Sequence, residues 1–245
     1  MFNFFVSETK KQGNTYSITD NDYNHIKNVL RMEIGEKLLV SVNGKSDLCE
    51  IEKFIDNTVV VKIIEENYQS TELETKIYLF QGLPKSDKME LIIQKTVELG
   101  VYAVVPVEMT NCVVKIDDKK KKSKQTRWQA ISESAAKQSK RNTIPEVFEV
   151  IPYKQAIEMA KELDLVLVPY ENEEGMLATK DALEALKNAK SVGIFIGPEG
   201  GFEPKEIELA KENGGKIISL GSRILRTETA AITAVSMCML NIEMN

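Results

Sequence analysis

Hydrophobic and polar positions divide the chain into two parts. Up to about residue 70, short segments alternate in polarity or are rich in β-branched residues, as in KLLVSVNG, DLCEIEKF and TVVVKIIEE. Asn43-Gly44 and Asp56-Asn57 separate these segments, and such pairs are typical of hairpin turns. One helix, from roughly Asp20 to Arg31, interrupts them. The pattern predicts a small β-barrel-type domain over residues 1–70, followed by a polar linker around 70–74.

From Thr75 onward, strand-like apolar runs alternate with amphipathic helices. The expected strands are KIYLFQGL, AVVPV, VFEVI, DLVLVPY and SVGIFIG. Helices are expected over about 87–99, 126–140, 154–163 and 177–187. In the first of them, the apolar residues share one face. This alternation predicts an α/β domain over residues 75–245, with a parallel sheet covered by helices on both faces.

The stretch from 194 to 240 contains two glycine-containing loops, each of which follows an apolar strand. The first loop is Gly197-Pro198-Glu199-Gly200-Gly201, and the second runs from Gly221 to Thr229. Because parallel strands end at the same edge of a sheet, the two loops predict a ligand site. The helix that follows, AAITAVSMCML, has no polar face, so we expect it to be buried inside the domain.

The GPEGG loop favours some ligands over others. Glycines let a ligand approach the backbone, but the loop matches neither GxGxxG nor GxxxxGK[ST]. Glu199 at its centre would repel a phosphate and would suit hydroxyls, amines or a positive charge. The alternative is a structural turn with an incidental glutamate.

The second loop brings Arg226, Glu228 and the hydroxyls of Ser222, Thr227 and Thr229 to the start of the last helix. The alternatives are that Thr227 or Thr229 is only the N-cap and that Arg226 only pairs with Glu228. A cap accounts for one threonine and leaves the other polar groups unexplained.

Charge is unevenly distributed along the chain. The net charge is −5, yet residues 111–141 contain ten Lys or Arg and three Asp or Glu. A basic segment on an acidic body can bind phosphates, because salt screens each charge over about 10 Å. The alternative is a solvated lysine-rich loop. Only five basic residues are arginine, and two of them, Arg223 and Arg226, lie in the second loop.

Composition excludes several classes of protein. A hydrophobic content of 42% is typical of a globular protein. The longest apolar run, 230–240, is about half of a membrane span, and the N-terminus lacks signal-peptide features. Three scattered cysteines without a CxxC pair indicate neither a disulfide framework nor a metal site. We therefore expect a cytoplasmic protein. His25 is the only histidine, which argues against a Cys-His nucleophile, and Cys238 is expected to be a core residue.

Several long motifs carry a resemblance to a known family. GPEGG followed by LGSRILRTETAA, with QGLPKSDKMELIIQKTVELGV upstream, resembles the ribosomal RNA small subunit methyltransferase E family. That family belongs to the SPOUT class of S-adenosylmethionine-dependent methyltransferases. FFVSE and HIKNVLRMEIGEKLLVSVNGK are similar to its PUA-like RNA-binding domain, so the resemblance extends through the whole chain.

The resemblance implies a fold and a reaction. The fold would be a SPOUT-type parallel sheet with a trefoil knot at about 165–240, which is an exception to the rule that chains do not thread their own loops. The protein would be a homodimer without membrane association. It would methylate N3 of a uridine in 16S ribosomal RNA, with naked RNA or the assembled 30S subunit as the substrate.

The resemblance also implies site residues. Those that would bind S-adenosylmethionine are Pro169, Tyr170, Ile196, Gly197, Pro198, Glu199, Gly200, Gly201, Leu220, Gly221, Leu225, Arg226, Thr227, Thr229 and Ala230. We expect Arg226 to stabilise the charge on the uracil and Glu228 or Glu199 to act as general base, unless the anion forms without one. RNA contacts are expected from His25, Arg31, Lys85, Arg127 and Arg141. The alternative for the four Lys and Arg side chains is an ordinary surface charge. For His25 the alternative is a buried histidine, which we slightly favour.

Two positions depart from the family pattern. Asn3 and the segment Met109-Thr110-Asn111-Cys112 stand where the family often has arginine. Any RNA or subunit contact of those arginines would be weakened or replaced here. Two other functions stay open on sequence alone: a non-catalytic RNA-binding or ribosome-assembly protein, and a nucleotide-using α/β enzyme.

Overall fold

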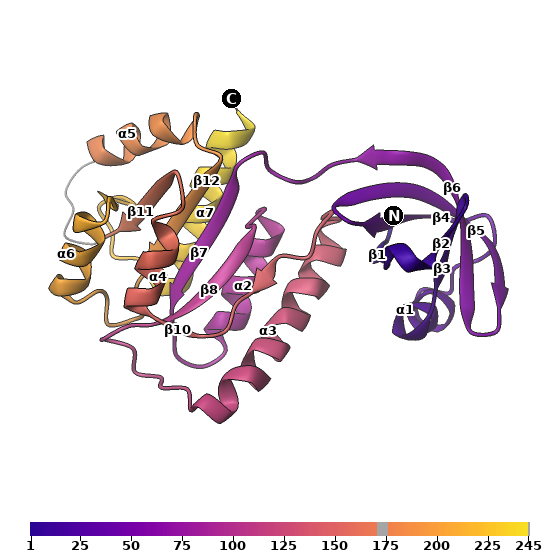
Figure 1. Ribbon diagram of the computed structural model, residues 1–245, viewed down its shortest axis with the longest axis horizontal. Coiled ribbons are helices and arrows are strands. Elements are labelled where there is room, and N and C mark those ends of the chain that lie inside the picture. Colours follow the sequence, from indigo (N-terminus) through magenta and orange to yellow (C-terminus); the bar gives the residue numbers. More distant parts are fainter. Residues whose placement is uncertain (171–175, 245) are drawn as a thin grey trace. The chain divides into compact units, whose positions relative to one another are not determined.

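The computed structural model describes residues 1–170 and 176–244, with the side chain of Asp118 left out. The chain forms two compact units (Figure 1). The N-terminal unit comprises Met1–Glu72 together with Ala136–Ile144, and the C-terminal unit comprises Leu73–Ala135 together with Pro145–Asn245. The N-terminal unit is therefore built from two separate segments of the chain.

One six-stranded sheet forms the N-terminal unit, in the order β1-β4-β5-β6-β3-β2. The strands are β1 (Asn3–Phe5), β2 (Lys11–Gln12), β3 (Thr15–Ile18), β4 (Lys37–Val42), β5 (Lys45–Ile55) and β6 (Thr58–Gln69). A short 3-10 turn, η1 (Glu8–Lys10), precedes β2. The β4–β5 and β5–β6 hairpins turn at the two predicted residue pairs, with Asn43, Gly44, Asp56 and Asn57 all at positive φ. The two hairpin predictions are confirmed.

The predicted helix of this unit is present in two parts. An α-helical turn, α1 (Asp20–Asn24), continues into a π-helical turn, η2 (His25–Val29). Ile26 is fully buried with Phe4, Ile18, Leu38 and Ile51 in the apolar core between this helix and the sheet.

Residues 136–144 complete the hydrogen bonding of the N-terminal unit. The Nδ2 of Asn3 donates to the carbonyl of Arg141 (2.8 Å), and the Nδ2 of Asn142 donates to Ser46 Oγ (3.0 Å). The guanidinium of Arg141 binds the Glu72 carboxylate, with Nε 3.0 Å from Oε1. Burial raises the pKa of Glu72, but the bonds from Arg141 and from the Asn142 and Thr143 N–H groups outweigh it and lower the pKa below its usual value. Glu72 is therefore a fixed part of this unit, although the sequence places it in a polar linker.

A parallel sheet with the order β10-β8-β7-β12-β11-β13 forms the centre of the C-terminal unit. Its strands are β7 (Lys76–Gly82), β8 (Ala103–Glu108), β9 (Glu146–Val147), β10 (Ile151–Pro152), β11 (Leu165–Pro169), β12 (Ser191–Ile196) and β13 (Lys216–Ile218). All of these pairings are parallel, as predicted. The expected strand VFEVI is divided: β9 and β10 are two short strands that both pair with β8.

Helices cover both faces of this sheet (Figure 1). They are α2 (Lys88–Glu98), α3 (Asp118–Gln138), α4 (Tyr153–Ala160), α5 (Leu177–Leu186), α6 (Pro204–Glu212) and α7 (Thr227–Glu243). Helices α2 and α5 pack against α7, whereas α4 packs against α6. Phe80 of β7 and Phe195 of β12 stack at 4.4 Å between ring centroids, and the ring of Tyr153 in α4 meets Phe195 edge-on.

Two helices differ from the sequence prediction. Helix α3 begins at Asp118, eight residues before the predicted start, so its lysine-rich segment is helical. Lysine has a high helix propensity, and it does not break a helix when its charge is solvated. Helix α7 is not buried all round: Thr227, Ala231, Ala234, Val235 and Cys238 form its buried face, while Leu240 is 47% exposed. Burial raises the pKa of the Cys238 thiol to about 12, which agrees with its predicted role as a core residue.

Among residues 1–170 and 176–244, no helix is long and apolar enough to cross a membrane.

Candidate functional site

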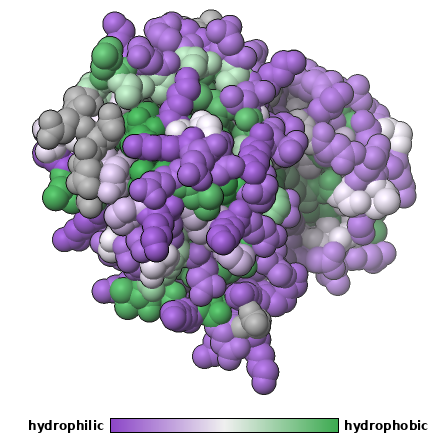
Figure 2. Space-filling view, turned by 60° about the vertical axis from the view of Figure 1, so that its left-hand side comes forward, coloured by the Kyte–Doolittle hydropathy of each residue, from purple (hydrophilic) through white to green (hydrophobic). Residues whose placement is uncertain are grey.

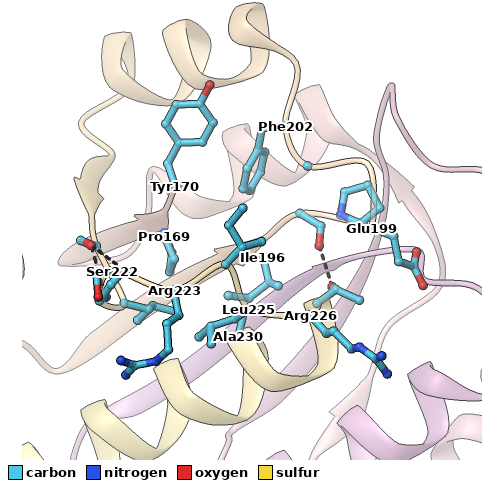
Figure 3. A pocket seen from close by; sticks show the side chains of 18 of the residues that line it. Pro169, Tyr170, Ile196, Glu199, Phe202, Ser222, Arg223, Leu225, Arg226 and Ala230 are labelled. Carbon is cyan, nitrogen blue, oxygen red and sulfur yellow. Dashed lines mark hydrogen bonds between the residues drawn. The ribbon is translucent and has the colours of Figure 1, made fainter. Parts of the chain in front are cut away.

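A cavity of about 1110 Å³ lies where β11, β12 and β13 end (Figure 3). It is lined by every residue predicted to bind the cofactor except Gly200 and Thr229. The structure adds four residues outside the two predicted loops, Lys88, Met176, Phe202 and Ser219, and three more from the second loop, Ser222, Arg223 and Ile224. The two loops chosen from the sequence therefore belong to one cavity, as the parallel strand order requires.

Part of the cavity wall is apolar. Ile196, Phe202, Leu225 and Ala230 point toward a common space, with the ring of Tyr170 to one side (Figure 3). Apolar side chains also reach solvent, since Ile224 is 85% exposed. The surface seen in Figure 2 has apolar side chains set among hydrophilic ones. The apolar wall of the cavity suits a flat, uncharged ring better than a phosphate.

Thr227 joins the two loops of the cavity. Its hydroxyl donates to the carbonyl oxygen of Gly197 (2.6 Å) and accepts from Nε2 of Gln81 at the end of β7 (2.9 Å). The N-cap of α7 is Arg226, which makes no side-chain capping bond. The interpretation of Thr227 or Thr229 as a simple N-cap is wrong: Thr227 is a buried tie to the first loop, and Thr229 is exposed.

The second loop is held from α5. The buried hydroxyl of Thr179 donates to the carbonyl of Ser219 (2.7 Å) and accepts from the Ser219 N–H (3.1 Å). Two residues later, Gly221 has a φ of +106°, a backbone conformation that residues with a Cβ atom rarely adopt. This loop thus turns sharply at the cavity edge while its beginning stays fixed.

Three charged side chains from distant segments meet at the cavity. The ammonium of Lys88 lies 3.1 Å from a carboxylate oxygen of Glu199 and 3.1 Å from one of Glu228. The alternative that Arg226 only pairs with Glu228 is wrong, because the ion-pair partner of Glu228 is Lys88. Hydrogen bonds to Glu199 and Glu228 raise the pKa of Lys88.

Glu199 is also held by backbone. The N–H of Lys85 donates to both of its carboxylate oxygens, at 3.0 and 3.3 Å. Desolvation raises the pKa of Glu199, but the bonds from this N–H and from Lys88 outweigh it and lower the pKa. Glu199 is therefore an ionised side chain that closes the loop before α2 onto the GPEGG loop.

Arg226 is exposed at the cavity edge. Figure 3 shows its side chain running away from Ile196 and Leu225, on the same side of the view as Glu199 and opposite Arg223. Asn111 lies on the outside of the first loop, where its Nδ2 donates to the carbonyls of Gly200 and Gly201. This side chain, at a position where an arginine is expected from the resemblance, thus supports the GPEGG loop.

The residues predicted to contact RNA differ in their surroundings. His25 is exposed and meets the ring of Phe4 edge-on, so the slight preference for a buried histidine is wrong. Arg31 and Lys85 are exposed. Arg127 is ion-paired with Glu90, its Nε 2.7 Å from Oε1.

Arg141 cannot serve as predicted. Its residue is only 2% exposed and its guanidinium binds Glu72, so its role is structural. Asn3 is likewise buried, where it accepts a hydrogen bond from Ser41 and donates to the Arg141 carbonyl.

Comparisons with known proteins identify the family of this chain. A family model described as the RNA methyltransferase domain matches residues 71–239, and one described as the RNA methyltransferase PUA domain matches residues 18–64. The ribosomal RNA small subunit methyltransferase E of Bacillus subtilis (strain 168) is 39% identical over 243 residues, which cover 96% of this chain and 95% of the relative. The chain belongs to the ribosomal RNA small subunit methyltransferase E family. The resemblance found in the sequence is confirmed.

Two solved structures of similar proteins contain the cofactor. One is the ribosomal RNA small subunit methyltransferase E from Neisseria gonorrhoeae bound to S-adenosyl methionine, with 31% identity, a TM-score of 0.82 and coverage of 96% and 95% of the two chains. The other is a putative methyltransferase from Legionella pneumophila in complex with the same cofactor, with 33% identity, a TM-score of 0.83 and coverage of 97% and 96%.

Proposed function

We propose that this protein transfers a methyl group from S-adenosylmethionine to N3 of a uridine in 16S ribosomal RNA of the small subunit. The observation that carries the proposal is the cavity at the ends of β11, β12 and β13, together with two relatives of similar fold that bind this cofactor. The cytoplasm, where ribosomal RNA is found, would be its place of action.

The residues of the cavity fit the cofactor. Adenine is flat and apolar on its faces, and Ile196, Phe202 and Leu225 offer matching surface (Figure 3). Glycine-rich loops leave backbone N–H and C=O groups accessible for its polar edge. The ionised Glu199 suits the hydroxyl, amine or sulfonium groups of this cationic molecule. S-adenosylmethionine supplies an activated methyl group when bound.

The protein must present the uracil to that methyl group. N3 of a paired uracil is hydrogen-bonded in a duplex, so the base has to be unpaired or flipped out to reach the cavity. When N3 loses its proton, negative charge spreads to the flanking carbonyl oxygens. Arg226, exposed at the cavity edge, is the side chain that we assign to this charge.

RNA would be positioned by both units. The match of residues 18–64 to an RNA methyltransferase PUA domain supports RNA contacts from the N-terminal unit, whose exposed candidates are His25 and Arg31. In the C-terminal unit, Lys85, Arg127 and the exposed lysines of α3 are candidates. Burial removes Arg141 from this set.

We also propose the family's knot at about 165–240, a closed barrel in the N-terminal unit and a homodimer. The half-exposed apolar helix α7 supports the dimer, because a second copy of the chain would cover Leu240 and its neighbours. Sedimentation equilibrium measures the molar mass of the protein in solution. A monomer mass at micromolar concentration would contradict the dimer.

Methyl transfer is tested with labelled S-adenosylmethionine on naked small-subunit RNA and on assembled 30S subunits, followed by mapping of the modified base. Label at uridine N3 supports the proposal. RNA binding without transfer would instead favour the non-catalytic assembly protein. Calorimetry that shows no binding of S-adenosylmethionine would favour an enzyme that uses another nucleotide.

Arg226→Ala is expected to lower the single-turnover rate of methylation by about 10²-fold or more, since one donor to a developing oxyanion is worth that much. Arg223→Ala, in the same loop but on the other side of the view in Figure 3, should cost far less. Wild-type rates for Arg226→Ala would remove Arg226 from the mechanism.

A further inference from the structure

Lys88 occupies a central place in the cavity that the sequence does not reveal. It is the first residue of α2, and its ammonium joins Glu199 of the first loop to Glu228 in the first turn of α7. We call Lys88, Glu199 and Glu228 the Lys88 cluster. Exposure within it falls from Lys88 (30%) through Glu199 (23%) to Glu228 (14%).

The two carboxylates are placed to hold Lys88. Glu228 is the least exposed member and does not line the cavity. Glu199 lines it, but its oxygens already accept from the Lys85 N–H and from Lys88. A carboxylate bound in this way is a weak base, which argues against proton removal by Glu199.

The ammonium of Lys88 has more N–H groups than the two carboxylates engage. An ammonium carries three N–H groups, and the two ion pairs with Glu199 and Glu228 engage at most two of them. No other partner for Lys88 lies among the residues that the structure describes, and the side chain lines the cavity. The third N–H is therefore available to a ligand.

Other charged groups on the adjoining elements are few. Arg226 precedes α7, and Lys85 and Asp87 lie on the loop before α2. On α2 itself, Glu90 is paired with Arg127. Lys88 is thus a fixed cation beside the cavity, and Arg226 is a second, exposed cation at its edge.

We propose that Lys88 is a catalytic residue whose third N–H bonds a carbonyl oxygen of the uracil and stabilises the base as an anion. This inference rests on the proposed function. In the step, the N3–H bond breaks and its proton passes to water. A bond then forms between N3 and the methyl carbon as the carbon–sulfur bond breaks, and its electron pair returns to sulfur. Lys88 stays protonated throughout.

The test compares Lys88→Met with wild type on RNA transcribed with uridine or with 5-fluorouridine, whose fluorine makes N3–H more acidic. On uridine, Lys88→Met should lower the single-turnover rate by about 10²-fold. The loss should be clearly smaller on 5-fluorouridine. In Lys88→Met, the pH at which the methylation rate rises should be higher than in the wild type. Lys88→Arg, which keeps the charge, should retain much of the activity.

Controls separate this role from a structural one. Lys95→Met changes a lysine of the same helix that pairs with Glu98 outside the cavity, and it should leave all rates unchanged. If Lys88→Met loses cofactor binding in calorimetry, the double variant Lys88→Met, Glu228→Gln is measured instead, because it removes the less exposed of the two carboxylates that lose their cation.

The outcomes distinguish the two proposals. An equal loss on both bases with an unshifted pH profile would overturn the role of Lys88 while leaving N3 methylation intact. Absence of N3 methylation by the wild-type protein would overturn the proposed function itself.

Discussion

Thr227 shows how a single hydroxyl organises this site. It donates to Gly197 and accepts from Gln81, so it connects the end of β7, the GPEGG loop and the start of α7. Hydrogen bonds buried in this way hold the backbone of one loop at a fixed distance from the other. The cavity shape thus depends on a residue that does not have to touch a ligand.

Thr227→Val keeps the shape of the side chain and removes both bonds. Because Gly197 and Gln81 then lose a partner in a buried place, we expect a loss of about 1–3 kcal/mol in the free energy of unfolding. Affinity for S-adenosylmethionine should fall as well. Urea unfolding and calorimetry measure the two effects. Thr229→Val, at an exposed position two residues later, is the matched control and should change neither.

The sequence predicts most of the cavity wall, including the charged Glu199 and Arg226, but it does not predict Lys88. Residues such as Ile196 to Gly201 are found because each loop directly follows a recognisable buried strand. Lys88 escapes prediction because its role depends on α2 meeting α7, and nothing in the local pattern distinguishes it from the surface lysines of the chain. The same reason hides Thr179 and Gln81.

At the scale of elements, prediction succeeds where burial imposes a pattern. The strands β7, β8, β11 and β12 are continuous apolar runs, and the buried face of α2 repeats at helical spacing. It misses the first two turns of α3, which are rich in lysine and have no apolar face to reveal the helix. The prediction that α7 is buried all round is also wrong, because an apolar helix sequence does not reveal which faces of the helix are packed against the rest of the chain.

The segment 136–144 gives a prediction at this scale. Glu72→Gln removes the negative charge that Arg141 binds, and the buried guanidinium loses its counter-charge. We expect a loss of about 1–3 kcal/mol of stability at neutral pH. Because the folded-state pKa of Glu72 lies below its unfolded value, its contribution is present above the unfolded pKa and is lost as the pH falls through the lower folded-state pKa.

Urea unfolding at several pH values measures this contribution. Plotted against pH, the free energy of unfolding of Glu72→Gln should approach that of the wild type as the solution becomes acidic. Glu74→Gln, an exposed glutamate two residues later, serves as the control. A difference from wild type that does not shrink as the pH falls below the unfolded pKa of Glu72 would show that the ion pair is not its source.

Across the whole molecule, binding to RNA must overcome a net charge of −5. The exposed lysines of α3 are expected to supply phosphate contacts, and each contact makes affinity depend on salt. Lys120→Gln combined with Lys124→Gln should weaken RNA binding and reduce the slope of log affinity against log salt by roughly 1–2. Filter binding over a salt series measures the slope.

Lys187→Gln, at the C-cap of α5, removes one positive charge outside the basic segment and should leave the slope unchanged. An unchanged slope for the α3 double variant would instead mean that these lysines only keep the helix solvated.

The two-segment construction of the N-terminal unit has a consequence for its evolution and engineering. Residues 1–72 on their own would leave Asn3, Ser46 and Glu72 without the partners that Arg141 and Asn142 provide. A gene fragment that ends at the first boundary therefore does not encode a complete folding unit. Unlike a domain attached by a single linker, this one cannot be exchanged between proteins by one recombination event, so its sequence is tied to that of the methyltransferase domain that carries residues 136–144.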